Sequence, residues 1–251
     1  MRSNLIYKRI KSISKTQSLG SKVYNLRCRP YSNFFSNFIL VHNCDTRFAV
    51  VNKRYCNVET IKEKGFKKTN NPLSCKKLLK IIERLNKRKG PYHSVSFTGG
   101  EPLLQKDFLK EILPSLRQKG MKIYLETNGI LSEELRQVID YIDFIAMDFK
   151  LPSSTGTEDF WDEHKRFLKI ASKRKVFVKA VICNSTKLKD IKKAGSLLAA
   201  CNKDIPFVLQ PNFFELSKQL IIKIRDFQRF CLKHLSDVRI IPQMHRLVGL
   251  R

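Results

Sequence analysis

Short apolar runs alternate along this chain with longer stretches in which apolar residues recur three and four positions apart. The longer stretches are typical of helices with one apolar face and cover residues 73–89, 103–119, 158–173, 187–201 and 216–235. The short runs are typical of strands and cover residues 95–97, 121–126, 141–149, 176–182, 206–209 and 238–241. Strands that alternate with helices at this spacing predict βαβ crossovers and a parallel sheet.

An earlier apolar run at residues 35–41 is a candidate first strand, which would bring the total to about seven. A closed barrel of this type needs eight strands. We therefore predict an α/β fold, namely a partial, open β/α barrel of about six to seven parallel strands with helices outside. In such parallel architectures the ligand site lies at the carboxyl ends of the strands.

Polar residues follow the carboxyl ends of the predicted strands. In chain order they are Glu101, Glu126 with Asn128, Asp148 with Lys150, Gln210, and Gln243 with His245. Because the carboxyl ends of parallel strands meet at one edge of a sheet, we expect these side chains to surround a common site.

The segment 94–105, which reads SVSFTGGEPLLQ, passes from a strand through Gly99 and Gly100 into a helix. Glycines allow the backbone to approach a ligand closely, and Glu101 supplies an acceptor for an ammonium or hydroxyl group. Pro102 fits the first position of the following helix. The same residues also fit an ordinary turn, because Gly-Gly pairs are common between elements.

Composition narrows the class of protein. The chain has 251 residues, 42% of them hydrophobic, which suits one α/β domain with a sizeable core. Its net charge of +27 is spread over every helix rather than gathered in one stripe, which favours an anionic small substrate over nucleic acid. The seven cysteines are an odd number without a disulfide pattern, so we expect a reducing, cytoplasmic location. The early apolar run 34–41 is too short to span a membrane.

The first 44 residues differ in composition from the rest, because they contain eight lysines and arginines and no acidic residue. An organelle transit peptide, a basic arm and an altered reading frame would each give this composition. We therefore treat residues 1–43 as an atypical basic segment and predict that the barrel occupies residues 44–251.

The GGEP loop behind a strand, with LETNG at the end of the next strand, resembles the radical S-adenosylmethionine (SAM) superfamily. Cys44-Asp45-Thr46 resembles the CDT sequence of one branch, the 7-carboxy-7-deazaguanine synthases. That family holds a four-iron, four-sulfur cluster through three cysteines spaced CxxxCxxC. The resemblance makes Cys44 a cluster ligand and the catalytic residue, and Thr46 a ligand for Mg²⁺.

The resemblance does not extend over the other two cluster positions. Counting back from Cys44 at the family spacing leads to Val41 and Asn37, neither of which can replace a thiolate. The family's upstream loop with glycine and glutamate is also missing. Cys28 and Cys56 are substitute candidates at the wrong spacing.

The resemblance implies roles for further residues, which match the family residue by residue. Those implied to bind the cofactor are Gly99, Gly100, Glu101, Glu126, Asn128, Asp148, Phe149, Lys150 and Gln210. Those implied to bind the substrate are Thr98, Gln243 and His245, the last two within a segment similar to the family's terminal PQxHKxxG.

The activity that the resemblance implies is a radical SAM lyase of queuosine biosynthesis. Such an enzyme uses the cluster, SAM and Mg²⁺ to convert 6-carboxy-5,6,7,8-tetrahydropterin to 7-carboxy-7-deazaguanine, with ring contraction and loss of ammonia. It takes its electron from a donor such as flavodoxin or ferredoxin, and a homodimer is left open. Two alternatives are a catalytically inactive relative without an intact cluster and a basic RNA-binding α/β domain.

Overall fold

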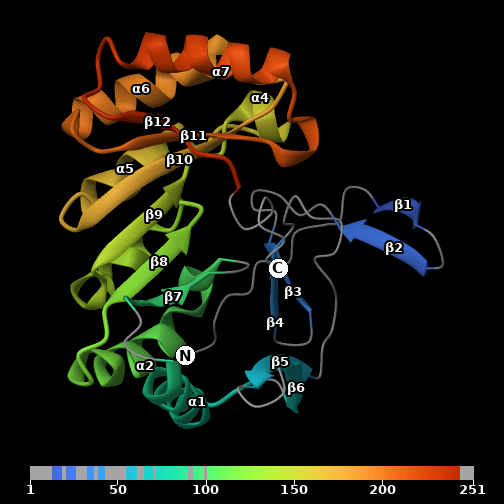
Figure 1. Cartoon of the computed structure of the whole chain (residues 1–251), viewed down its shortest axis with the longest axis vertical. Helices are drawn as coiled ribbons and strands as arrows, with labels where there is room; N and C mark the ends of the chain where they lie inside the picture. The colour runs from blue at the N-terminus through green and yellow to red at the C-terminus, as the bar shows by residue number, and fades with distance from the viewer. Residues whose placement is uncertain are drawn as a thin grey trace. The chain divides into compact units, whose positions relative to one another are not determined.

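A computed structural model of the chain (Figure 1) describes residues 13–18, 21–26, 33–36, 39–42, 55–60, 65–70, 72–89, 93–98 and 101–243. It divides into two compact units. One comprises residues 1–74 with Gly99–Glu101, and the other comprises residues 75–98 with 102–251. The division that the sequence predicts at residue 43 falls within the first unit.

The described strands of the first unit form antiparallel hairpins. Their strands are β1 (Ile13–Ser18) with β2 (Ser21–Leu26), β3 (Asn33–Ser36) with β4 (Ile39–His42), and β5 (Tyr55–Thr60) with β6 (Gly65–Asn70). The prediction of a first parallel strand at residues 35–41 is therefore wrong. Phe35 pairs with Leu40 and Ser36 pairs with Ile39, so the two halves of the apolar run are antiparallel to each other. Ser36 and Asn37 are residue types that favour turns, and they interrupt the apolar run at this point.

The second unit is built on a six-stranded sheet in which all pairs of strands are parallel. Its strands are β7 (Val95–Phe97), β8 (Ile123–Thr127), β9 (Phe144–Asp148), β10 (Lys175–Ile182), β11 (Phe207–Pro211) and β12 (Val238–Ile240). They lie in the sheet in the order of the sequence, and β7 and β12 form its two edges. The predicted open, parallel α/β architecture is confirmed.

Helices precede the first strand of this sheet and connect the successive strands, as Figure 1 shows. They are α1 (Cys75–Lys89), η1 (Pro102–Gln105), α2 (Lys106–Gln118), α3 (Ser132–Arg136), η2 (Ile139–Tyr141), α4 (Pro152–Thr155), α5 (Trp161–Ala171), α6 (Leu188–Asn202), η3 (Phe213–Glu215) and α7 (Lys218–Cys231). Within the described ranges, no helix combines the length and the apolar composition that crossing a membrane would need.

The two faces of the sheet differ because side chains alternate along each strand. On one face the strand residues are buried and form one apolar core with the helices; they include Ile123, Leu125, Ile145, Met147, Val178, Ala180, Phe207 and Leu209. On the other face the polar residues Glu126, Asp148, Lys179 and Gln210 are only partly buried. We call this second face the polar face, and it carries the candidate site.

Candidate functional site

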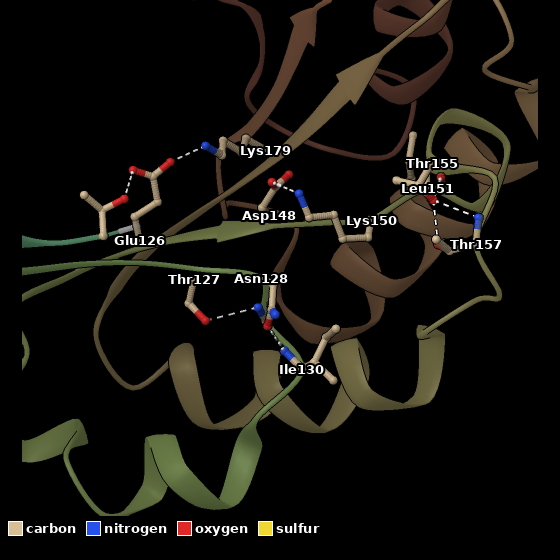
Figure 2. A network of polar contacts seen from close by, with 12 residues as sticks. Glu126, Thr127, Asn128, Ile130, Asp148, Lys150, Leu151, Thr155, Thr157 and Lys179 are labelled. Carbon is tan, nitrogen blue, oxygen red and sulfur yellow. Dashed lines mark hydrogen bonds and ion pairs between the residues drawn. The ribbon is translucent and has the colours of Figure 1, made fainter. Parts of the chain in front are cut away.

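The centre of the polar face is a chain of contacts around Glu126 (Figure 2). The Thr98 hydroxyl, at the end of β7, donates to Glu126 Oε2 at 3.0 Å. The Lys179 ammonium, on β10, forms an ion pair with Glu126 Oε1. Lys179 must cross β9 to make this contact, and Ala146, the residue of β9 in register with Glu126, has a side chain small enough to leave that path open. The contacts therefore join the ends of three strands.

Next to this chain, Asp148 and Lys150 form a second ion pair. Lys150 Nζ lies 2.6 Å from Asp148 Oδ2, and the two side chains are only 23% and 13% exposed respectively. The other carboxylate oxygen, Asp148 Oδ1, is buried without a hydrogen-bond partner among the described residues. Buried acceptors are almost always satisfied. A ligand that donates from a hydroxyl or amino group would satisfy this oxygen.

The turn after β8 has its own internal hydrogen bonds, which Figure 2 shows in part. The Thr127 hydroxyl accepts from the Gly129 N–H at 3.2 Å, and Asn128 Oδ1 accepts from the Ile130 N–H at 3.1 Å. Gly129 has a φ of +67°, and a Cβ at this position would lie 2.6 Å from atoms of the Met147 side chain. Only glycine fits both constraints without strain. The turn thus presents Asn128 beside the carboxyl end of β9.

His164, in the first turn of α5, joins the turns that follow β8 and β9. Its Nε2 accepts from the backbone N–H of Lys150 at 3.2 Å, and its Nδ1 lies 3.0 Å from the carbonyl oxygen of Gly129. The ring is fully buried and stacks on Phe149 with 4.7 Å between ring centroids. Burial lowers the pKa of His164 to about 4, so the ring is neutral at physiological pH.

Tyr124 lies on the polar face two residues before Glu126. Burial, and then the charge of Glu126, raise the pKa of Tyr124 to about 12. Its phenol therefore remains protonated and can donate a hydrogen bond, but it does not serve as a base near neutral pH.

The other residues singled out in the sequence do not all lie on the polar face. Gln210 is on the polar face of β11, because its register partner Val181 lies two residues after Lys179. Gln243 follows β12 and is partly buried. Glu101 is fully buried and belongs to the first unit. The side chain of Phe149 packs in the apolar core rather than on the polar face. The remaining predicted site residues lie outside the described part of the chain; they are Cys44, Thr46, Gly99, Gly100 and His245.

Sequence reasoning missed Lys179, Tyr124 and His164. Lys179 had a usable signal, since a lysine inside the apolar run 176–182 is unusual for a buried strand. His164 had a weaker one, because it lies three residues after Trp161 on the apolar face of its helix. A lone histidine at such a position is more often a core residue than part of a site.

The described part of the chain contains no group of three or more His, Cys, Asp or Glu side chains placed to hold a metal ion. Burial raises the pKa of Cys75 and of Cys231 to about 11 in each case. These two cysteines therefore remain protonated thiols, which are poor metal ligands. The predicted ligands Cys44 and Thr46 lie outside the described residues.

An open parallel sheet with polar side chains at the carboxyl ends of its strands defines an α/β enzyme scaffold, and sequence comparison identifies which one. The profile of the Radical SAM superfamily matches residues 54–198. The chain therefore belongs to the radical SAM superfamily.

Three curated relatives, each named 7-carboxy-7-deazaguanine synthase, show that within this superfamily the chain belongs to the family of these synthases. The protein from Geobacter sulfurreducens is 39% identical over 198 residues, which cover 77% of this chain and 79% of the relative. The protein from Thermococcus kodakarensis is 34% identical, with 72% and 71% covered. The protein from Clostridium acetobutylicum is 29% identical, with 86% and 88% covered. Membership in this superfamily implies SAM and a four-iron, four-sulfur cluster as cofactors.

Proposed function

We propose that this chain binds SAM and an anionic, carboxylated pterin, and that, once a cluster is held, it converts 6-carboxy-5,6,7,8-tetrahydropterin to 7-carboxy-7-deazaguanine with loss of ammonia. The observation that carries the proposal is the Oδ1 of Asp148, which is buried without a hydrogen-bond partner among the described residues and lies beside a network of cationic and carboxylate side chains. This donor and acceptor set suits a ligand that combines hydroxyl, ammonium and carboxylate groups, as SAM does.

The residues of this chain bind and orient the reactants. Asp148 and Glu126 accept hydrogen bonds from the nucleoside part of the cofactor, and Asn128 and Lys150 complete that side. Thr98 and Gln243, with His245 from the following segment, contact the pterin. The excess of positive charge attracts the pterin carboxylate. SAM supplies, when it is bound, the hydrogen-abstracting radical that the protein cannot supply itself.

The residues at the family's cluster positions do not fit a cluster as well as the strand ends fit SAM. Of the three positions spaced CxxxCxxC, only Cys44 carries a thiolate, while positions 37 and 41 carry asparagine and valine. Cysteine thiolates are the usual protein ligands of iron–sulfur clusters, and the family uses three of them. A SAM-binding relative that lacks radical chemistry is therefore the second candidate function.

The test uses the purified, anaerobic full-length chain with SAM, Mg²⁺, a reduced flavodoxin and the carboxylated pterin. In a chain whose three cluster cysteines are restored by Asn37→Cys and Val41→Cys, mass spectrometry should detect 7-carboxy-7-deazaguanine together with 5′-deoxyadenosine, and adding Asp148→Ala should abolish both. Cleavage of SAM without conversion of the pterin would overturn the substrate assignment. Binding of SAM by calorimetry without any cleavage would identify the second candidate function instead.

A further inference from the structure

We propose that His164 is a positioning residue, whose imidazole fixes the spacing between the turn after β8 and the turn after β9 and thereby holds the site residues on both. The inference rests on the proposed function, because Asn128 and Lys150 are assigned there to the cofactor. Its geometric part can be tested without any ligand.

The sheet pairing between β8 and β9 ends before the two turns begin. The register of β8 with β9 runs as far as Thr127 and Met147. Beyond that pair, β9 remains attached on its other side, where the Phe149 N–H donates to the carbonyl oxygen of Lys179 at 2.8 Å. On the β8 side the imidazole of His164 links the two turns, because it contacts Gly129 in one turn and Lys150 in the other.

The two contacts of the His164 ring determine which of its nitrogens carries the proton. A carbonyl oxygen can only accept and a backbone N–H can only donate, so His164 must carry its proton on Nδ1 and leave Nε2 bare. A doubly protonated ring would direct an N–H at the N–H of Lys150. The charged groups that act on the ring are Asp148 and Glu163, which favour its protonation, and Lys150, which opposes it. Burial outweighs them and keeps the ring neutral.

The two residues that His164 contacts, Gly129 and Lys150, are linked to side chains of the polar face. Gly129 directly follows Asn128, and the Lys150 N–H belongs to the residue whose side chain pairs with Asp148. A shift of either turn would therefore move a side chain of the polar face. A histidine that only filled the core would have no such connection.

The test compares His164→Phe, which keeps the ring and loses both hydrogen bonds, with His164→Gln, which keeps a donor and an acceptor. The control is Leu198→Ala, at a fully buried position of α6. At a temperature where every variant is folded, His164→Phe should weaken SAM binding about tenfold by calorimetry, and His164→Gln should recover most of that loss. Leu198→Ala should lower the melting temperature and leave the affinity unchanged.

Two readouts need no ligand and keep the inference testable if SAM does not bind. In the wild type, ¹⁵N NMR should find the proton of His164 on Nδ1, and the opposite tautomer would overturn the proposal. In His164→Phe, hydrogen exchange should rise in residues 127–130 and 148–150 more than elsewhere. Unchanged exchange there, or an affinity loss no greater than that of Leu198→Ala, would mean that His164 is only a core residue. Failure of wild-type binding alone would count against the proposed function and not against this geometry.

Discussion

The ammonium of Lys179 on β10 reaches across β9 to pair with the carboxylate of Glu126 on β8. The same carboxylate accepts from the Thr98 hydroxyl, so Glu126 joins side chains from both directions along the sheet. Its two oxygens are thereby oriented before any ligand arrives. Such preorganisation is what a site needs if it is to hold a ligand in one position.

Replacing Lys179 should therefore affect ligand binding more than folding. Lys179→Met removes one partner of a partly exposed pair, so the free energy of unfolding should fall by only about 1 kcal/mol. Glu126 then loses the contact that orients it, and calorimetry should show weaker binding of SAM or of the pterin. The control is Lys173→Met, at an exposed position beyond α5. Equal affinities for the two variants would remove Lys179 from the site.

A second prediction concerns Asp148 Oδ1, which is buried without a hydrogen-bond partner among the described residues. SAM should raise the melting temperature of the wild type, since binding to the folded state stabilises it. Asp148→Asn should lose most of that increase, because the charge that attracts the ligand and holds Lys150 is gone. The matched control lies at the start of the same strand, where Asp143 pairs with Arg117 at 2.7 Å. Asp143→Asn should lower the melting temperature without ligand, yet keep the ligand-induced increase.

A third prediction concerns the turn after β8. Gly129→Ala combines a positive φ with a Cβ placed 2.6 Å from the side chain of Met147. It should lower the free energy of unfolding by about 3 kcal/mol, the combined effect of backbone strain and overpacking. At Gly156 φ is +66° but nothing lies within 4 Å of an added Cβ. Gly156→Ala should cost about 1 kcal/mol. Urea denaturation measures both, and equal losses would contradict the close contact with Met147.

The pH dependence of stability follows from His164. Its pKa falls from 6.5 to about 4 on folding, so the unfolded chain binds more protons between these two values. Stability should therefore rise with pH across that window and be lost as the pH falls through it, by about 3 kcal/mol in all. In His164→Gln this contribution should vanish. Urea denaturation between pH 4.5 and about 7.5 compares the two slopes, and parallel curves would show that His164 does not titrate this way.

The sequence predicted a parallel sheet of about six to seven strands because short apolar runs alternate with longer stretches of helical spacing, which indicates βαβ crossovers. It predicted the wrong topology at residues 35–41, because a short apolar run does not reveal a chain reversal. It located the polar strand ends, since these depend only on where each apolar run stops.

The contacts among those strand ends could not be predicted in the same way. That Lys179 reaches Glu126 depends on the register of three strands and on the small side chain of Ala146. That His164 reaches Gly129 and Lys150 depends on where α5 packs, and α5 begins at Trp161 rather than near residue 158 as the apolar spacing indicated. Both are tertiary relationships between residues far apart in the chain, which local periodicity does not contain.

The last prediction concerns iron. Cys44 alone gives one thiolate where the family spacing calls for three, so anaerobic reconstitution of the wild type should yield well under the iron content of a complete cluster. Introducing Asn37→Cys and Val41→Cys restores the CxxxCxxC spacing and should raise both the iron content and the visible charge-transfer absorption. Grafting the family's missing upstream loop should raise the yield further, because that loop also shapes the pocket.

The control for this experiment is Cys201→Ser, which removes an exposed cysteine outside the family's spacing and should leave the iron content unchanged. A complete cluster in the wild type would contradict the prediction and point to Cys28 or Cys56 as ligands. If the grafted chain holds a full cluster and cleaves SAM, the cluster was the only part of the preorganised site that the wild type lacked. Formation of 7-carboxy-7-deazaguanine would then follow from the residues already in place, and its absence would limit the chain to SAM chemistry on another substrate.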